Sequence, residues 1–441
     1  MRTNFSPAAI STALLFSILT SAATAFAQAK DPVFLSPVVF DTGGRSPFAL
    51  AAADIDNDGD MDLVVTNEGR GTGLQLGGDP NGPTISVFTN TGDWSPTSNG
   101  FLPPTLLFLA GKCEGANCQP REIALMQMNS GTTPDIVVTT KNGAGYVLVY
   151  KNTAGTFPQL PAVVQNLHFN GTDHRANGLV VTDIDNDGFN DVGIASIFDK
   201  TVVTLLNDGL GQGAFKTGEG EVGIWTVQGG HAFDLVWGKF WNDSPNPQLA
   251  DLATCNSAHD SISLLRNMGA NSFSVTNRSV TPYHDYRNVV RKRFNNDGAH
   301  DLAYVSGFEG EVHVFIGDGN GTLSHGVGDE YIIDTRDPPG TDPFGIDAGR
   351  INPGSTNDIV VTEKKWPEVV VFLGNGSGKG NGTFKTPGLH YSLESQPNTV
   401  ANPEHVLLVD LNDDGLLDIV TANSGTDNIS VLINTFQSIQ P

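Results

Sequence analysis

An acidic segment of nine residues, repeated three times in one register, constrains this chain most strongly. It spans 54–62, 183–191 and 410–418, and its first copy reads Asp-Ile-Asp-Asn-Asp-Gly-Asp-Met-Asp. Carboxylate or amide side chains stand at positions one, three, five and nine, and glycine stands at position six. Carboxylates this close together repel one another unless a hard cation lies between them, and Ca²⁺ prefers several oxygen ligands in flexible geometry. We therefore predict about three structural Ca²⁺ ions per chain.

The predicted calcium ligands come from all three copies of this acidic segment. They are Asp54, Asp56, Asp58, Asp60 and Asp62; Asp183, Asp185, Asp187 and Asp191; and Asp410, Asn412, Asp414 and Asp418. In an EF-hand the loop would continue to a Glu at position twelve and lie between two helices. Here position nine runs directly into apolar residues such as Leu63-Val64-Val65, which is typical of a strand. The segments are therefore predicted to be calcium loops between β-strands.

Weaker copies of the same unit tile the rest of the chain. An Asp before an apolar run, which we call the closing Asp, recurs at Asp62, Asp135, Asp191, Asp251, Asp301, Asp358 and Asp418. A second short strand is expected after each, at 85–88, 146–150, 202–206, 262–265, 312–316, 369–373 and 429–433. The repeat is roughly 50–70 residues long, close to the length of a four-stranded propeller blade. The prediction is an all-β, seven-bladed β-propeller.

These loops and their spacing resemble the FG-GAP/VCBS repeat family, the calcium-loop β-propellers known from the head of integrin α-subunits. The resemblance covers nearly all of residues 28–441, which we expect to form a single propeller. It implies that the strand before each loop is innermost and that three more strands follow outward. On that mapping 33–40 is an outermost strand, and the last repeat ends one strand short. We expect the N-terminal strand to pair with 429–433 and close the ring, which removes an exposed sheet edge.

The first 27 residues are predicted to be a signal peptide. Arg2 gives a positive start, 8–19 form an apolar core, and Ala25-Phe26-Ala27 matches a cleavage site. The alternative is an uncleaved anchor, although the apolar run is short for a membrane span. We expect a protein without a membrane span, secreted or at the cell surface, in an extracellular or periplasmic location. A formal net charge of −24 argues against nucleic acid and anionic membranes as partners.

The chain's irregular composition is concentrated in 92–119, which we interpret as an insertion within the array. This stretch is rich in Ser, Pro, Gly and Asn. It contains Cys113 and Cys118, which are close enough in sequence to form a small disulfide in an oxidising compartment. The third cysteine, Cys255, follows a predicted strand and is expected to be a small buried hydrophobe.

Three of the loops that lack the acidic set carry a cation at position one. Lys239, Arg293 and Arg350 are predicted to occupy the vacant ion sites and to pair with the closing Asp of their own loops. The alternative is that they are unrelated surface cations on loops that have diverged, since exposed ion pairs contribute little.

A ligand site is expected on the face of the ring opposite the calcium loops. The connections into the innermost strands and those between the second and third strands meet there. The candidate ligand-binding residues are Arg45, His174, Arg175, His231, His284, Arg287, Trp366 and His405. Polar and aromatic side chains that converge on one mouth are typical of a binding site. The alternative is that any propeller must place polar residues at these positions.

No catalytic motif such as Gly-x-Ser-x-Gly, His-Glu-x-x-His or a Walker loop is present in the sequence. The leading hypothesis is a monomeric, non-catalytic recognition or adhesion module for an extracellular polysaccharide or protein. The runner-up is a secreted carbohydrate-active enzyme, a lyase or hydrolase, in which His174, His231 or His284 would act as a base facing Arg or Ca²⁺. A third possibility is a structural surface protein without a ligand.

Overall fold

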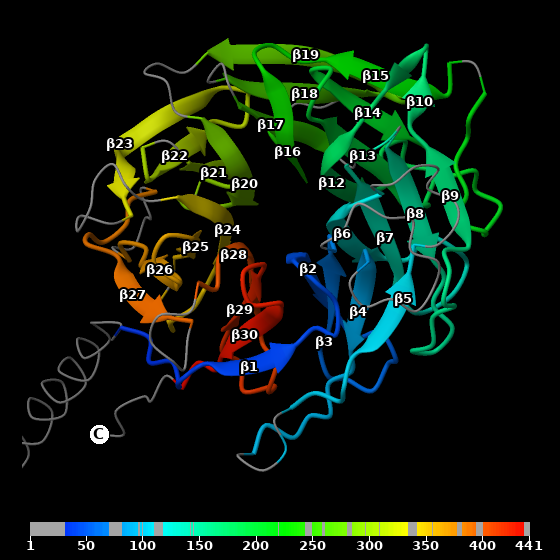
Figure 1. Ribbon diagram of the computed structural model, residues 1–441. Coiled ribbons are helices and arrows are strands. Elements are labelled where there is room, and N and C mark those ends of the chain that lie inside the picture. The colour runs from blue at the N-terminus through cyan, green and yellow to red at the C-terminus, as the bar shows by residue number, and fades with distance from the viewer. Residues whose placement is uncertain are drawn as a thin grey trace, which may run out of the picture.

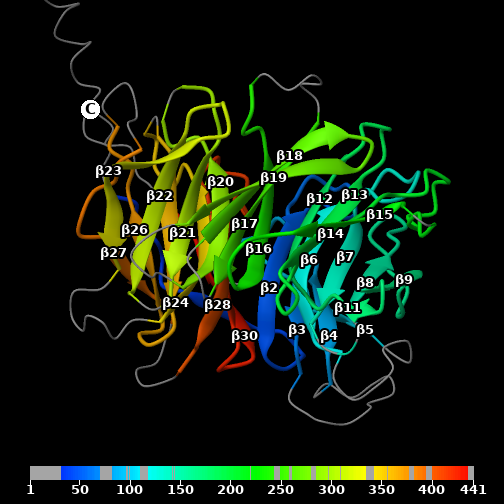
Figure 2. The same cartoon turned by 90° about the horizontal axis from the view of Figure 1, so that it is seen from above.

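Seven antiparallel sheets of four strands stand around a common axis, as predicted (Figure 1). The computed structural model describes residues 31–69, 82–95, 98, 100–109, 118–141, 143, 145–218, 220–242, 249–257, 261–279, 285–295, 297–307, 309–333, 342–354, 356–376, 382–393 and 400–435. The predicted signal peptide, Cys113 and His284 lie outside these residues. The strands run across the ring between its two faces, which is clear when the ring is seen from the side (Figure 2). In the described part of the chain no helix is long and apolar enough to cross a membrane.

The blades are numbered I to VII, and in each the chain steps outward from the axis. The innermost strands are β2 (Pro47–Ala53), β6 (Pro120–Met126), β12 (Ala176–Thr182), β16 (His231–Gly238), β20 (Tyr286–Lys292), β24 (Pro343–Gly349) and β28 (Pro403–Val409). The second strands are β3 (Asp62–Asn67), β7 (Asp135–Thr140), β13 (Asp191–Ser196), β17 (Asp251–Ser257), β21 (Asp301–Ser306), β25 (Asp358–Glu363) and β29 (Asp418–Asn423). Every second strand therefore begins at one of the predicted closing Asp residues.

The outer half of each blade is made of a third and a fourth strand. The third strands are β4 (Thr84–Phe88), β8 (Tyr146–Tyr150), β14 (Thr201–Leu205), β18 (Ser261–Gly269), β22 (Glu311–Gly317), β26 (Glu368–Phe372) and β30 (Asn428–Leu432). The fourth strands are β5 (Thr105–Phe108), β9 (Val163–Asn166), β15 (Val222–Thr226), β19 (Ser272–Ser279), β23 (Leu323–Ile332), β27 (Leu389–Ser392) and, for blade VII, β1 (Val38–Asp41). A small hairpin of β10 (His168–Phe169) and β11 (Thr172–Asp173) lies between blades II and III.

The N-terminal strand closes the ring, which confirms the prediction from the repeat count. β1 pairs antiparallel with β30, with Val38 opposite Val431 and Asp41 opposite Asn428. The pairing continues beyond the strand, because the Leu35 N–H donates to the carbonyl of Ile433 at 2.9 Å. The innermost strands also contact one another all around the axis, including β2 with β28. Blade VII is thus built from both ends of the described chain.

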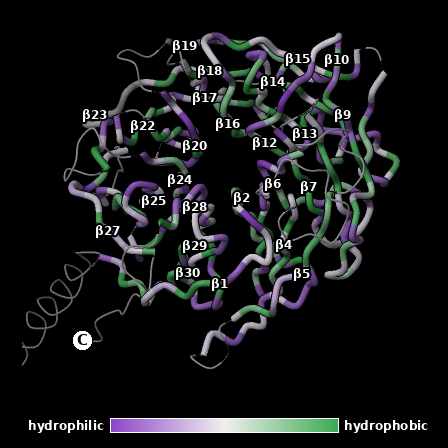
Figure 3. Tube along the Cα trace, viewed as in Figure 1, coloured by the Kyte–Doolittle hydropathy of each residue, from purple (hydrophilic) through white to green (hydrophobic). Residues whose placement is uncertain are grey.

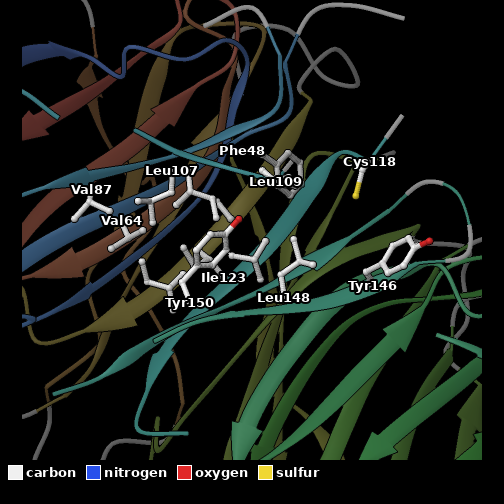
Figure 4. Packing of buried hydrophobic residues seen from close by; sticks show 14 of the residues in the cluster. Phe48, Val64, Val87, Leu107, Leu109, Cys118, Ile123, Tyr146, Leu148 and Tyr150 are labelled. Atoms are coloured by element: carbon white, nitrogen blue, oxygen red, sulfur yellow. The ribbon is translucent and has the colours of Figure 1, made fainter. Parts of the chain in front are cut away.

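The hydrophobic core lies between the blades. Both faces of a blade are covered by its neighbours, so every residue of β3 and β4 is buried, polar ones such as Thr84 and Ser86 included. Hydrophobic residues recur along the strands around the ring (Figure 3). Between blades I and II, for example, Val64 and Leu107 of blade I pack in one cluster with Ile123, Leu148 and Tyr150 of blade II (Figure 4). Each blade therefore gains much of its stability from its neighbours, as in other repeat arrays.

One region differs from the sequence interpretation. The stretch 92–119 was expected to be an irregular insertion, yet it contains β5, the fourth strand of blade I. Two prolines directly before this short strand make its apolar residues look like part of a loop, because proline is unfavourable inside strands. In the same stretch Cys118 is disulfide-bonded, while Cys255 is free and buried. The pairing of Cys118 with Cys113 stays a prediction, since Cys113 lies outside the described residues.

Candidate functional site

The three acidic loops share one backbone conformation and lie on one face of the ring, which we call the loop face. Position four has positive φ in all of them (62° at Asn57, 62° at Asn186 and 54° at Asp413), and so has the glycine at position six. Such backbone angles favour glycine, asparagine and aspartate. The carboxylate at position one accepts two backbone N–H groups in each loop; Asp54 accepts those of Asp58 and Gly59, both at 3.1 Å.

The acidic side chains converge in these loops as a cation site requires. Ligand oxygens of Asp54, Asp56 and Asp58 lie within 4.8 Å of one another, and the same is true of Asp183, Asp185 and Asp191. Burial and the neighbouring carboxylates of Asp58 and Asp54 raise the pKa of Asp56. Its Oδ1 is buried, with no hydrogen-bond partner in the described part of the chain. An orphaned buried oxygen among carboxylates fits a hard cation such as Ca²⁺.

The other two loops add detail to this fit. In blade III the ammonium of Lys216 lies 3.6 Å from Asp185 and 3.5 Å from Asp187, so this loop already attracts a positive group. In blade VII the amide of Asn412 donates to Asp414 at 3.1 Å, while its oxygen accepts the Asp414 N–H. In blade I the N–H of Asp60 donates to Asp58 at 2.9 Å. Asp60 does not belong to the converging group of three, and its side chain lies beside Gly92.

The closing Asp has the same buried environment in all seven blades. Asp62 accepts the N–H of Ile55, the second residue of its loop, at 2.9 Å and the N–H of Asn90, beyond the third strand, at 2.8 Å. The equivalent bonds in the other six blades measure 2.6 to 3.1 Å. All seven closing residues are at most 2% exposed. Burial raises the pKa of Asp62 to about 6 and those of Asp191 and Asp418 to about 7. The backbone N–H donors act in the opposite direction and lower these pKa values.

An asparagine near the end of the third strand ties each of five loops to the preceding blade. Asn152 of blade II donates to the carbonyl of Ile55 in blade I at 2.7 Å and to that of Pro134 in its own loop at 2.9 Å. The same pair of bonds is made by Asn90, Asn207, Asn267 and Asn434. In blade V the N–H of Gly321 donates instead to the carbonyl of Phe240 in blade IV. The sequence analysis missed this network, whose signal is a recurrent asparagine near the end of the third strand.

The predicted pairing of loop cations with closing Asp residues is wrong. Lys239, Arg293 and Arg350 are exposed. Within the described ranges no ion pair joins them to Asp251, Asp301 or Asp358. The physical reason is that both oxygens of each closing carboxylate already accept buried backbone N–H groups. Leaving those donors unpaired would cost more than a solvated ion pair returns.

Lys239 and Arg293, together with Arg291, act instead on His300 in blade V. The backbone N–H of Lys239 donates to His300 Nδ1 at 2.7 Å, and the guanidinium of Arg291 lies 3.4 Å from His300 Nε2. Burial, followed by the charges of Arg291, Arg293 and Lys239, lowers the pKa of His300 to about 4. The loop face therefore has acidic loops in blades I, III and VII and a basic region at blades IV and V.

The opposite face, which we call the mouth face, carries the candidate ligand-binding residues. Two of them contact the same ring: Arg175 lies 5.0 Å from the Phe198 ring centre, and the His231 ring lies 5.9 Å from the same ring. Phe198 remains 52% exposed. The Phe198 ring of blade III thus lies between the Arg175 guanidinium of its own blade and the His231 imidazole of blade IV.

Other candidates on this face hold neighbouring blades together. Arg45 of blade I pairs with Asp427 of blade VII at 2.9 Å. Arg287 of blade V pairs with Asp342 of blade VI and lies 3.3 Å from Asp285. For Arg45 and Arg287, these contacts support the alternative that polar residues at such positions serve the structure of the ring and not a ligand.

The remaining candidates are dispersed. His174 is buried, pairs with Asp199 and has a buried Nε2 without a hydrogen-bond partner among the described residues. His405 lies on an innermost strand, where burial lowers its pKa to about 4 and keeps the ring neutral. Trp366 is 40% exposed and belongs to blade VI. His284 lies outside the described residues, and within the described chain no contact brings His174, His231 and His405 together into one catalytic group.

Three phenylalanines from different blades meet near the axis at the mouth face. Phe344 of blade VI lies 5.9 Å from Phe48 of blade I and 6.0 Å from Phe233 of blade IV, measured between ring centres. Sequence reasoning missed this cluster, although a proline opens the innermost strand directly before two of its members, at Pro47 and Pro343.

Acidic side chains lie below this aromatic cluster on the innermost strands. Asp234 accepts the N–H of Val289 in the next blade at 3.0 Å, and Asp347 accepts that of Leu408 at 2.8 Å. Burial raises the pKa of Asp234 to about 6. Burial and the nearby Asp234 raise the pKa of Glu122 to about 8. Carboxyls held in this way join neighbouring innermost strands, which is a structural role.

Comparison with known proteins supports the fold. No protein-family model and no curated protein matches the chain. Two solved structures described as BBS1N in complex with ARL6DN, soaked with mercury or lead, match at 12% identity with TM-scores of 0.55 and 0.54. The matches cover 92% and 93% of this chain and 98% and 99% of the other. An Agrocybe aegerita lectin that recognises non-reducing terminal N-acetylglucosamine matches at 17% identity, with a TM-score of 0.48 and coverage of 78% and 80%. At these identities the likeness shows the propeller fold alone.

Proposed function

We propose that this chain is a secreted, calcium-binding β-propeller of the FG-GAP/VCBS type that recognises an extracellular polysaccharide or protein without catalysis. The β-propeller architecture supports the fold part of this proposal, and the three acidic loops, two of which bring three carboxylates together, support the cation part. Bound Ca²⁺ would neutralise the loop acids and stiffen the loop face, with Asp54, Asp56 and Asp58 as the ligands in blade I. The ligand would bind on the mouth face.

The observation that carries the recognition role is the exposed ring of Phe198. A large aromatic side chain that is 52% exposed, yet held between Arg175 and His231, is pre-organised for contact with a partner. Little conformational entropy remains to be lost when a ligand packs on such a ring. Of the histidines that a lyase would need as bases, His174 is buried and paired with Asp199, and His231 lies against Phe198, which favours binding over turnover.

The proposal is tested with the calcium-loaded mature protein on an array of glycans and extracellular proteins, with product release measured in parallel. We expect binding without new unsaturated or reducing ends. Phe198→Ala should weaken binding about tenfold, the effect of losing one aromatic anchor. Leu210→Ala is the matched control, because Leu210 is 77% exposed but lies on the loop face. Product formation would establish an enzyme instead, and equal binding by both variants would remove the site from the mouth face.

A further inference from the structure

Blade III differs from the other two acidic blades in one side chain beside its loop. The ammonium of Lys216 lies 3.6 Å from Asp185 and 3.5 Å from Asp187, which are the carboxylates at loop positions three and five. All three side chains are partly buried, so water screens their charges less than those of fully exposed groups. The loop of blade III therefore has a positive group of the chain itself at two of its acids.

Backbone contacts fix Lys216 at this place. Its N–H donates to the carbonyl of Leu206, directly after β14, at 2.8 Å. The preceding residue, Phe215, is buried and forms a β-bridge with Asn207, whose N–H donates to the closing Asp191 at 2.7 Å. Lys216 is thus tied to the same turn that holds the closing Asp of its own loop.

The other two acidic blades have a leucine at the equivalent position. In blade I this residue is Leu102, which follows the bridged Phe101, and in blade VII it is Leu35, which follows the bridged Phe34. Their N–H groups donate to the carbonyl of the residue directly after the third strand, at 3.0 and 2.9 Å. Both leucines are 53% exposed, so burial does not require an apolar residue at this position. Of the three acidic blades, only blade III has a cation there.

The converging carboxylates of blades I and III differ in a way that matches this cation. In blade I the group within 4.8 Å contains the acid at position five, Asp58. In blade III the corresponding group contains the closing Asp191, while the acid at position five, Asp187, accepts a hydrogen bond from Lys216 at 3.5 Å. A carboxylate that faces an ammonium is less available as a metal ligand, and the ammonium also repels Ca²⁺.

We infer that Lys216 sets the calcium affinity of the blade III loop by competing with the ion for Asp185 and Asp187. This inference rests on the cation part of the proposed function and makes one of the three loops unlike the other two. The calcium affinity of such loops depends on the charge of their ligands. Blades I and III both have carboxylates at positions one, three, five and nine, and in blade III Lys216 offsets one of these charges. The blade I loop consequently fills at a lower calcium concentration than the blade III loop.

The test exchanges the two kinds of residue between the blades of the mature protein. Titration with Ca²⁺ in competition with a chromophoric chelator measures the affinities, and native mass spectrometry counts the bound ions. Lys216→Leu should tighten one site about tenfold, because two partly buried ion pairs no longer oppose the metal. Leu102→Lys should weaken one site by a similar factor, and the exposure of Leu102 allows a lysine without burying its charge.

The matched control is Lys385→Leu in blade VI. Lys385 follows the bridged Phe384, and its N–H donates to the carbonyl of Leu373 at 2.8 Å, so it has the equivalent position in a blade without an acidic loop. Lys385→Leu changes the net charge of the protein as Lys216→Leu does, and it should leave every calcium affinity unchanged.

Two results would overturn the inference while about three bound ions left the proposed cation sites standing. One is a calcium titration of Lys216→Leu that matches the parent, which would make the contacts of Lys216 an ordinary surface ion pair. The other is an equal effect of Lys216→Leu and Lys385→Leu, which would be a general effect of net charge. If neither the parent nor the variants bind calcium, the cation part of the proposed function fails together with this inference.

Discussion

Blades I, III and VII differ from the other four blades in their loops but not in the network beneath those loops. In all seven the closing Asp is buried and holds the loop to the end of the third strand. Only in these three do further acids, or the amide of Asn412 in blade VII, fill positions one, three and five. In blades IV and V the corresponding surface is basic around His300.

The closing Asp can both hold its blade together and lie among the predicted cation ligands. Asp191 accepts the backbone N–H of Ile184 and also lies within 4.8 Å of the Asp183 and Asp185 oxygens. Asp301 makes the same backbone contacts in a loop without that acidic set. The closing Asp is therefore needed for the blade whether or not a cation binds. The other acids are the proposed ligands of the cation.

The largest effect is expected from removing the strand that only blade VII takes from the other end of the chain. Deletion through Phe40 should lower the free energy of unfolding by about 5 kcal/mol, from several backbone hydrogen bonds of about 1 kcal/mol each and the burial of one aromatic side chain. Phe40 packs 5.3 Å from Phe101 between ring centres, so blade I would lose a contact as well. Urea denaturation measures this change, and a truncated protein with unchanged stability would contradict the role of β1 in closure.

The next largest effect concerns the network that all blades share. Asp301→Ala in blade V should cost about 4 kcal/mol, because it leaves the buried N–H groups of Phe294, Asn295 and Gly317 without an acceptor. Asp297→Ala is the control, since Asp297 is exposed in the same loop. Denaturant unfolding should separate the two variants clearly. Similar losses would mean that the closing Asp has no special role in blades without an acidic loop.

The acidic blades should differ from the others in their response to calcium. Each occupied loop is expected to add about 2.7 kcal/mol at a free Ca²⁺ concentration of roughly one hundred times the dissociation constant. Chelation should therefore lower the melting temperature in calorimetry. Asp56→Asn in blade I should reduce that drop, while Asp297→Asn in blade V should leave it unchanged. A melting temperature that changes with neither calcium nor chelator would refute the cation sites.

The smallest effect is expected at the basic region of blades IV and V. The pKa of His300 is about 4 in the folded protein, below its ordinary value of 6.5. The unfolded chain therefore takes up a proton first as the pH falls, so the stability contributed by neutral His300 is full above pH 6.5 and is lost between 6.5 and 4. After allowance for partial exposure, this amounts to about 1 kcal/mol between pH 7 and pH 5.

His300→Gln should remove this part of the pH dependence. Unfolding of both proteins by urea at pH 7 and pH 5 provides the measurement. A variant that loses as much stability on acidification as the parent would show that His300 is protonated in the folded state, and that the cations around it do not act as described.

The sequence was most informative where the physics is local and repeated. A closing Asp followed by Leu63-Val64-Val65 in blade I, and by similar apolar runs elsewhere, marks the start of every second strand, and seven copies require seven blades. The missing strand of the last repeat also indicated that 33–40 would pair with β30, and Val38–Asp41 does so. The outermost strand β5 was not recognised because its neighbours are prolines and its apolar run is short.

The sequence could not decide where equivalent side chains point. Arg293 and Arg350 stand at the position that an ion-binding Asp occupies elsewhere, yet they are exposed, because backbone N–H groups take both oxygens of the closing carboxylate. The competition between these N–H groups and the cations for the carboxylate depends on the geometry of the turn after the third strand, which is distant in sequence. The sequence pattern alone does not show that geometry.

The sequence by itself determined the number of blades, their strand order, the closure by the N-terminal strand and the three acidic loops. These follow from short-range periodicity, turn residues and charge spacing, which act within one repeat. Only the tertiary structure decided that Phe48, Phe233 and Phe344 meet near the axis. These residues come from three different blades. Closing the ring alone sets the distances between them.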